Sequence, residues 1–157
     1  MEITDDVLAV KSKRFGNFVI DLIFRYVIVF VLSFIAIVID PEGFTAWIET
    51  VTTLEDIMYS LLLLMIYFIV TESIFQRTVG KLITGTMVVM ADGSKPSFGT
   101  IVLRTLCRLI PFEALSFIGD DAYGWHDNFS NTYVVDIKLY NEAMSRKNSF
   151  DDIGKSE

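Results

Sequence analysis

The chain has 157 residues, of which 52% are hydrophobic and 21% charged, and its net charge at pH 7 is −7. A single cysteine excludes an internal disulfide framework, and the acidic balance argues against nucleic acid as a partner. Two long stretches, 27–39 and 57–71, contain no Asp, Glu, Lys or Arg. A water-soluble domain would interrupt such stretches with polar residues to keep a solvated face. The composition therefore indicates a small integral membrane protein that has the lipid bilayer as its surroundings.

The first apolar segment runs from about Arg14 to Ile39, which exceeds the roughly 20 residues that a helix needs to cross the hydrocarbon. Asn17, Asp21 and Arg25 interrupt its N-terminal half. A removable signal peptide is disfavoured, because a polar stretch precedes the segment and no small-residue cleavage site follows it. We interpret it as a retained transmembrane span.

The second apolar segment runs from about Met58 to Phe75, with Glu72 near its end. The intervening residues 40–56 include five Asp or Glu and no Lys or Arg, whereas basic residues precede the first segment and follow the second. Basic flanks stay in the cytoplasm. The sequence therefore predicts an antiparallel two-helix transmembrane hairpin with a cytoplasmic N-terminus and an external acidic loop.

Two short β-prone runs follow the hairpin, at residues 86–90 and 132–137, and Asp92-Gly93 is a turn signal after the first run. Unpaired strands in hydrocarbon would leave backbone groups unsatisfied, at about several kcal/mol for each group. We therefore expect the two runs to pair with each other at the cytoplasmic surface, as a small two-stranded β element.

Between these runs, residues 98–110 form an apolar helical pattern that carries Arg104 and Arg108 on one face. Pro111 interrupts the pattern before a second apolar stretch at 112–118. Since paired strands would keep both flanks on one side of the membrane, we expect an interfacial or re-entrant helix pair. One kinked third span, with the C-terminus outside, is the alternative.

The predicted fold class is mainly α and integral to the membrane, combining the transmembrane hairpin, the interfacial or re-entrant helices and the two-stranded β element. We expect one membrane domain at residues 13–140. The polar residues 141–157 are expected to form a disordered cytoplasmic tail.

Ionisable residues inside the apolar segments are the main candidates for a functional site. Asp21 and Glu72 fall at similar depth in an antiparallel hairpin, and a lone charge there costs about a few kcal/mol. The candidate partners are four arginines: Arg14, Arg25, Arg104 and Arg108. Two interpretations stay open, namely a polar pocket in which a carboxylate binds a cation or exchanges a proton, and an internal salt-bridge network that fixes helix packing.

We expect Asp21 to pair with Arg14 or Arg104, with Asp127 bridging from the Gly124–Asp127 segment. His126 beside Asp127 offers too few ligands for a metal site, so a turn or cap is the simpler interpretation.

The remaining motifs indicate no catalytic chemistry. Thr78-Val79-Gly80-Lys81 is not a phosphate-binding loop, because Phe75 occupies the position where that motif requires glycine. No nucleophile with a neighbouring base is visible, so we expect neither enzymatic activity nor a cofactor.

Several motifs in order resemble the RDD family of bacterial membrane proteins, which is named for one arginine and two aspartates. Arg14, Asp21 and Asp127 match these three residues. Further similarity lies in Thr78-x-Gly80-Lys81-x3-Thr84-Gly85, in Leu103-Arg104-x3-Arg108 and in His126-Asp127-x2-Ser130-x-Thr132. The similar region extends from about residue 13 to residue 135. The resemblance implies an inner-membrane protein with a transport-related role, some family members being similar to Na⁺/H⁺ antiporters.

Two functions are consistent with these features. The first is a homo-oligomer that exchanges a monovalent cation for protons, in which Asp21 and Glu72 alternate between proton and cation while Arg14, Arg104 and Asp127 hold the cytoplasmic end together. Two spans cannot enclose a path, so oligomerisation would supply the missing wall. The alternative is a non-transport accessory or scaffold protein whose surface strands and acidic loop bind a partner.

Overall fold

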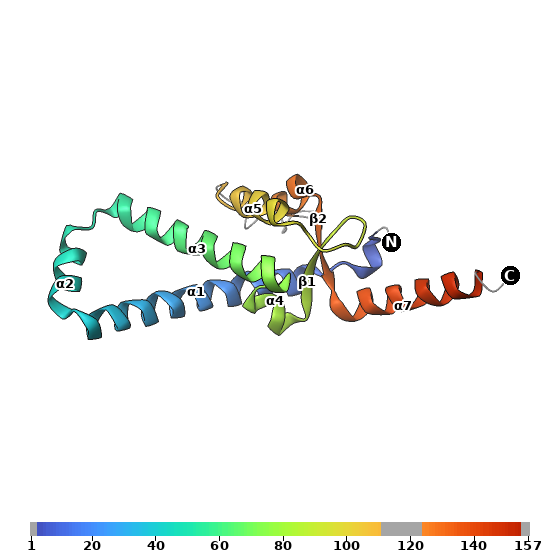
Figure 1. Cartoon of the computed structure of the whole chain (residues 1–157), viewed down its shortest axis with the longest axis horizontal. Helices are drawn as coiled ribbons and strands as arrows, with labels where there is room; N and C mark the ends of the chain where they lie inside the picture. Colours follow the sequence, from blue (N-terminus) through green and yellow to red (C-terminus); the bar gives the residue numbers. More distant parts are fainter. Residues whose placement is uncertain (1–2, 111–123, 155–157) are drawn as a thin grey trace.

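The computed structural model describes residues 3–110 and 124–154, which are mainly helical with one small two-stranded sheet (Figure 1). The elements in chain order are η1 (Asp5–Val7), α1 (Lys11–Ile39), α2 (Pro41–Thr50), α3 (Thr53–Phe75), α4 (Val79–Thr84), β1 (Thr86–Met90), α5 (Phe98–Cys107), α6 (Trp125–Ser130), β2 (Thr132–Asp136) and α7 (Ile137–Gly154).

Helices α1 and α3 form the two long arms of a hairpin. In Figure 1, α1 runs away from the sheet, α2 crosses at the far end and α3 returns toward the sheet. With 29 and 23 residues, both helices are long and apolar enough to cross a membrane. Their apolar side chains are largely uncovered, as in Phe30, which is 70% exposed, and Ile39, which is 77% exposed. Such surfaces need lipid or another apolar partner around them.

The acidic connection between these helices is itself partly helical, because capping residues start both α2 and α3. Asp40 accepts a hydrogen bond from the Gly43 N–H, and Pro41 occupies the first helical position of α2. Thr52 and Glu55 form a reciprocal capping box at the start of α3.

The two β-prone runs pair as the sequence predicts. β1 and β2 are antiparallel, with Thr86 opposite Asp136, Val88 opposite Val134 and Met90 opposite Thr132. Ahead of β1, helix α4 ends at Gly85, whose φ of 71° lies in the left-handed region that glycine adopts without strain. That turn directs the chain from α4 into the sheet.

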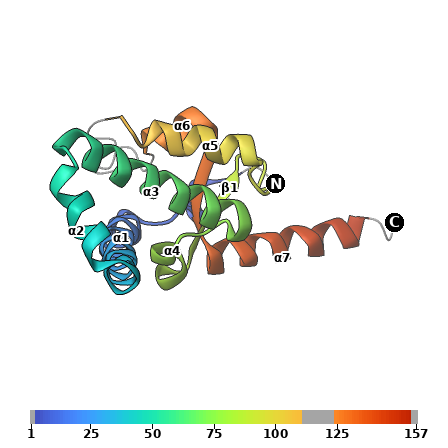
Figure 2. The ribbon, with the colours of Figure 1, turned by 60° about the vertical axis from the view of Figure 1, so that its left-hand side comes forward.

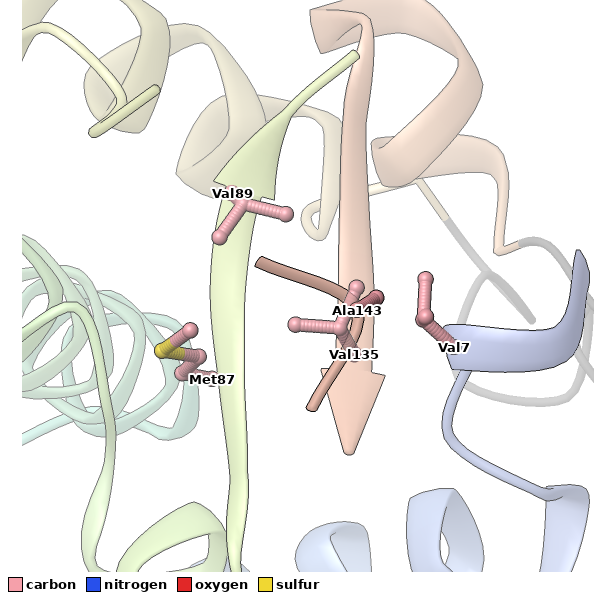
Figure 3. Packing of buried hydrophobic residues seen from close by; sticks show 5 residues of the cluster. All are labelled: Val7, Met87, Val89, Val135 and Ala143. Carbon is pink, nitrogen blue, oxygen red and sulfur yellow. The ribbon is translucent and has the colours of Figure 1, made fainter. Parts of the chain in front are cut away.

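A small apolar core lies against the sheet, and its members are Val7, Met87, Val89, Val135 and Ala143. Figure 3 shows these side chains gathered around the two strands, with Val7 coming from η1. Ala143 belongs to α7, so this helix contributes to the core. The Tyr140 hydroxyl also donates to the Gly93 carbonyl at 2.8 Å.

Helix α7 extends to Gly154, where the sequence predicts a disordered tail from residue 141. Contacts of Ala143 and Tyr140 with the sheet region give a physical reason for this order, because packing against a core stabilises a helix of weak propensity. In Figures 1 and 2, α7 projects away from the hairpin on the side opposite α2.

Helix α5 has 10 residues, or about 15 Å, which is about half of the hydrocarbon thickness. It packs against α3 and α6, and Figure 2 shows α5 and α6 together on one side of α3. The expected break at Pro111 and the apolar stretch at 112–118 lie outside the described residues.

Candidate functional site: a buried charge cluster

The sheet end of the hairpin contains a cluster of buried charged side chains that come from five helices. Its three carboxylates belong to Asp21 of α1, Glu72 of α3 and Asp127 of α6, and each is at least nine-tenths buried. The cations that contact them are Arg14, Lys81, Arg104 and Arg108. Ion pairs thus connect residues that are far apart in the chain at one end of the molecule.

Glu72 is fully buried and lies against three cations. Its Oε1 accepts from Lys81 Nζ at 2.8 Å and from Arg108 Nη2 at 2.7 Å, while Arg104 Nε lies 3.3 Å from Oε2. Burial lowers the pKa of the Lys81 ammonium, and Glu72 opposes this shift by favouring the charged form. Glu72 thereby links α3 to both α4 and α5.

Asp127 forms the second centre of the cluster. Arg14 Nη2 donates to its Oδ2 at 2.5 Å, Arg104 donates to Oδ1, and the Gly124 N–H donates to Oδ2 at 3.2 Å. Burial by itself raises the pKa of Asp127, but Arg104, His126 and Arg14 lower it overall to well below its ordinary range. The carboxylate is therefore ionised at neutral pH and joins α1, α5 and α6.

Arg104 connects the two centres, because its fully buried guanidinium contacts both Glu72 and Asp127. It also donates to the Thr132 hydroxyl at the start of β2. Asp127 thus bridges Arg14 and Arg104, whereas the sequence predicted that it would bridge in a pairing of Asp21 with one of these arginines.

Asp21 has a different environment, because its partners are neutral. The Tyr67 hydroxyl donates to Oδ1 at 2.8 Å, the Thr78 hydroxyl to Oδ2 at 2.6 Å and the Gly80 N–H to Oδ1 at 2.8 Å. These bonds attach α1 to α3 and to the first turn of α4.

The expected pairing of Asp21 with Arg14 or Arg104 is therefore corrected: both arginines bind Asp127 instead. Asp21 lies about 10 Å beyond Arg14 along the helix axis. The start of α4 approaches α1 closely at this depth and supplies the donors that Asp21 accepts.

Gly80 allows this close approach of α4 to α1. A Cβ atom built at Gly80 would lie 2.5 Å from the Asn17 carbonyl oxygen and 3.0 Å from Asp21 Cγ. Both distances are shorter than ordinary van der Waals contacts, so a larger residue would push α4 away. The glycine of the Thr78-x-Gly80-Lys81 segment thus has a steric role.

Arg25, the fourth predicted arginine, is half-buried and forms no ion pair with the residues that the structure describes. Its guanidinium carbon lies 5.1 Å from the centre of the Tyr26 ring. Arg108, by contrast, combines its bond to Glu72 with a position 4.0 Å over the Phe68 ring.

Three residues of the site were not predicted from the sequence: Tyr67, Thr78 and Lys81. Tyr67 lies within an uncharged apolar stretch and gives no signal apart from its hydroxyl. Thr78 and Lys81 belong to the Thr-x-Gly-Lys segment directly after the second span, and this motif could have identified both as site residues.

A cavity of about 200 Å³ lies within the cluster, between α1, α3 and α5. Its lining residues are Arg14, Asn17, Phe18, Asp21, Leu22, Arg25, Leu64, Phe68, Lys81, Arg104, Arg108, His126, Asp127 and Val134. Within the described ranges, no group of three His, Cys, Asp or Glu side chains is placed to hold a metal ion.

Two uncovered apolar helices, joined at one end by buried charges, indicate a membrane protein. The model of the RDD family matches residues 8–139, which is most of the chain, and the protein therefore belongs to the RDD family. Searches of the curated proteins and of the solved structures find no match. Of the three residues that carry the family resemblance, Arg14 and Asp127 bind each other and Asp21 fixes the start of α4.

Proposed function

We propose that the chain is a multi-pass protein of the bacterial inner membrane, with its N-terminus and sheet on the cytoplasmic side. The charge distribution supports this orientation. Residues 40–56 carry only acidic charges, whereas Lys and Arg gather at the sheet end of both long helices.

The function that the geometry supports best is that of a non-enzymatic accessory or scaffold protein, in which the buried charges hold the sheet end together. The observation that carries this proposal is that each of the three carboxylates already has several polar or charged partners. Glu72 has three cationic partners, Asp127 has two and Asp21 accepts three hydrogen bonds. Breaking one buried pair to admit an ion costs about 3–5 kcal/mol.

The second candidate is proton-coupled exchange of a monovalent cation by a homo-oligomer, with Asp21 as the coupling group. Two observations favour it. Asp21 is bound only by neutral donors among the described residues, and it lines the cavity. Glu72, the other predicted coupling carboxylate, is a weaker candidate, because three cations already compensate its charge.

A flux measurement separates the two functions. The full chain is reconstituted in proteoliposomes that contain a pH-sensitive dye, and a Na⁺ or K⁺ gradient is imposed. The accessory function predicts the same proton movement as in protein-free vesicles. Protein-dependent proton movement that disappears in Asp21→Asn, and persists in the matched outer variant Asp56→Asn, would overturn it and establish exchange.

A further inference from the structure

The cavity inside the charge cluster has an excess of positive charge. Five Lys or Arg side chains and two carboxylates line it, and Glu72 lies behind Lys81, Arg104 and Arg108. Counting these described groups, two positive charges remain uncompensated. An anion is therefore the natural occupant, since unlike charges attract most strongly in a partly buried site.

Arg108 has a donor available for such an anion. Its side chain is nine-tenths buried, and Nη2 is used by Glu72. Nη1 is also buried, yet it has no hydrogen-bond partner among the described residues. A buried charged donor without a partner is costly, and an anionic oxygen in the cavity would satisfy it.

Arg25 adds a second available cation on the α1 side of the cavity. No carboxylate in the described part of the chain forms an ion pair with Arg25, and the Arg25 side chain is half-buried. The hydrocarbon is about 30 Å thick, so a helix that begins at its outer edge with Ile39 reaches the inner edge near residue 20. Arg25 therefore lies about one turn inside the hydrocarbon. A cation at that depth gains from an anionic group at the membrane interface.

The other wall of the cavity is apolar and belongs to the two long helices. Phe18 and Leu22 come from α1, and Leu64 and Phe68 come from α3. A basic recess that continues into an apolar wall between membrane helices fits an amphiphile with an anionic head. A small inorganic anion would use only the basic half.

We propose that this cavity binds the headgroup phosphate of an anionic phospholipid. Arg25 and Arg108 contact the phosphate, and the apolar wall receives the first part of an acyl chain. The volume of about 200 Å³ has room for one such group, since it corresponds to roughly seven water molecules of the bulk liquid. This site is compatible with the accessory function, whereas cation exchange through Asp21 would use the same cavity.

Native mass spectrometry of the full chain in non-ionic detergent tests the proposal. The probes are phosphatidylglycerol and phosphatidylcholine with identical acyl chains, and inorganic phosphate as the free anion. We expect phosphatidylglycerol to bind at least about tenfold more tightly than phosphatidylcholine, whose choline cation is repelled by the positive cavity, and Arg25→Gln and Arg108→Gln each to weaken phosphatidylglycerol binding by about tenfold. Arg146→Gln, on the exposed face of α7, should retain it.

Unchanged binding of phosphatidylglycerol in both cavity variants would overturn the proposal. Equal binding of the two lipids, with inorganic phosphate retained by wild type and lost in Arg25→Gln, would also overturn it and assign the cavity to a free anion. Arg108→Gln removes a partner of Glu72, so its folding is checked by circular dichroism. If it does not fold, Arg25→Gln alone decides, because Arg25 has no ion pair to lose among the described residues.

Discussion

Arg14 of α1 and Asp127 of α6 are 113 positions apart in the chain and are joined by a buried hydrogen bond of 2.5 Å. This contact closes the sheet end of the molecule, because it attaches the first long helix to the segment that leads into β2. Arg104 binds the same carboxylate from α5. Three elements that are separate in sequence thus depend on one aspartate.

Replacing Glu72 should destabilise the protein strongly. Glu72→Gln leaves Lys81, Arg104 and Arg108 buried without their common anion, and we expect a loss of about 3–5 kcal/mol in the free energy of unfolding. The measurement is denaturant unfolding in detergent. The matched variant Glu49→Gln, on the exposed α2, should change stability by less than about 0.5 kcal/mol. Equal stability of the two variants would contradict this role.

The acid sensitivity of the protein should depend on Asp127. Its pKa is lower in the folded state than in the unfolded state, so the folded protein holds this proton less tightly. The stabilisation is therefore fully present above the unfolded value of about 4 and is lost as the pH falls toward the folded pKa. The difference in unfolding free energy between wild type and Asp127→Asn should stay constant from about pH 7 to 5 and shrink below about pH 4. An increase in this free-energy difference as the pH falls would contradict the predicted direction of the pKa shift of Asp127.

A methyl group at position 80 should separate α4 from α1. Gly80→Ala places a Cβ atom 2.5 Å from a backbone oxygen, and overpacking of this kind costs about 1–3 kcal/mol. Gly99→Ala is the matched control, since the nearest atom to its Cβ is 3.9 Å away. Thermal unfolding should show a lower midpoint for Gly80→Ala alone. Equal midpoints for the two variants would show that the helices do not approach as described.

The orientation of the chain can be tested by cysteine labelling in a Cys107→Ser background. We expect Glu49→Cys to react with an impermeant reagent from the periplasmic side, and Lys95→Cys and Ser149→Cys to react only after the membrane is opened. The reason is the acidic character of residues 40–56 and the basic flanks of the hairpin. Labelling of Ser149→Cys from outside would favour a third span.

The long helices and the strand pair could be predicted from the sequence because their signals are local. Stretches without charges identify α1 and α3, and β-branched runs identify β1 and β2. The order of α7 could not be predicted in this way. Its sequence is polar, and its packing depends on Ala143 meeting a core formed by distant residues.

Most members of the charge cluster could be predicted, although Lys81 was missed and Arg25 forms no ion pair among the described residues, and the pairing could be predicted only in part. Asp127 was expected to bridge in a pairing of Asp21 with an arginine, and instead it binds Arg14 and Arg104 without Asp21. The partners of Asp21 depend on how closely α4 approaches α1, and that distance is set by Gly80, which carries no charge signal. Spacing along one helix identifies residues on a common face, but it does not reveal which neighbouring backbone will reach them.

The most direct test of the account is a double-mutant cycle on Arg14 and Asp127. Unfolding free energies are measured in detergent for wild type, Arg14→Gln, Asp127→Asn and the double variant. A buried pair that joins α1 to α6 predicts a coupling energy of about 1–3 kcal/mol, with the double variant more stable than the two single losses would give by addition. Additive losses, within about 0.5 kcal/mol, would contradict the claim that this pair closes the sheet end of the molecule.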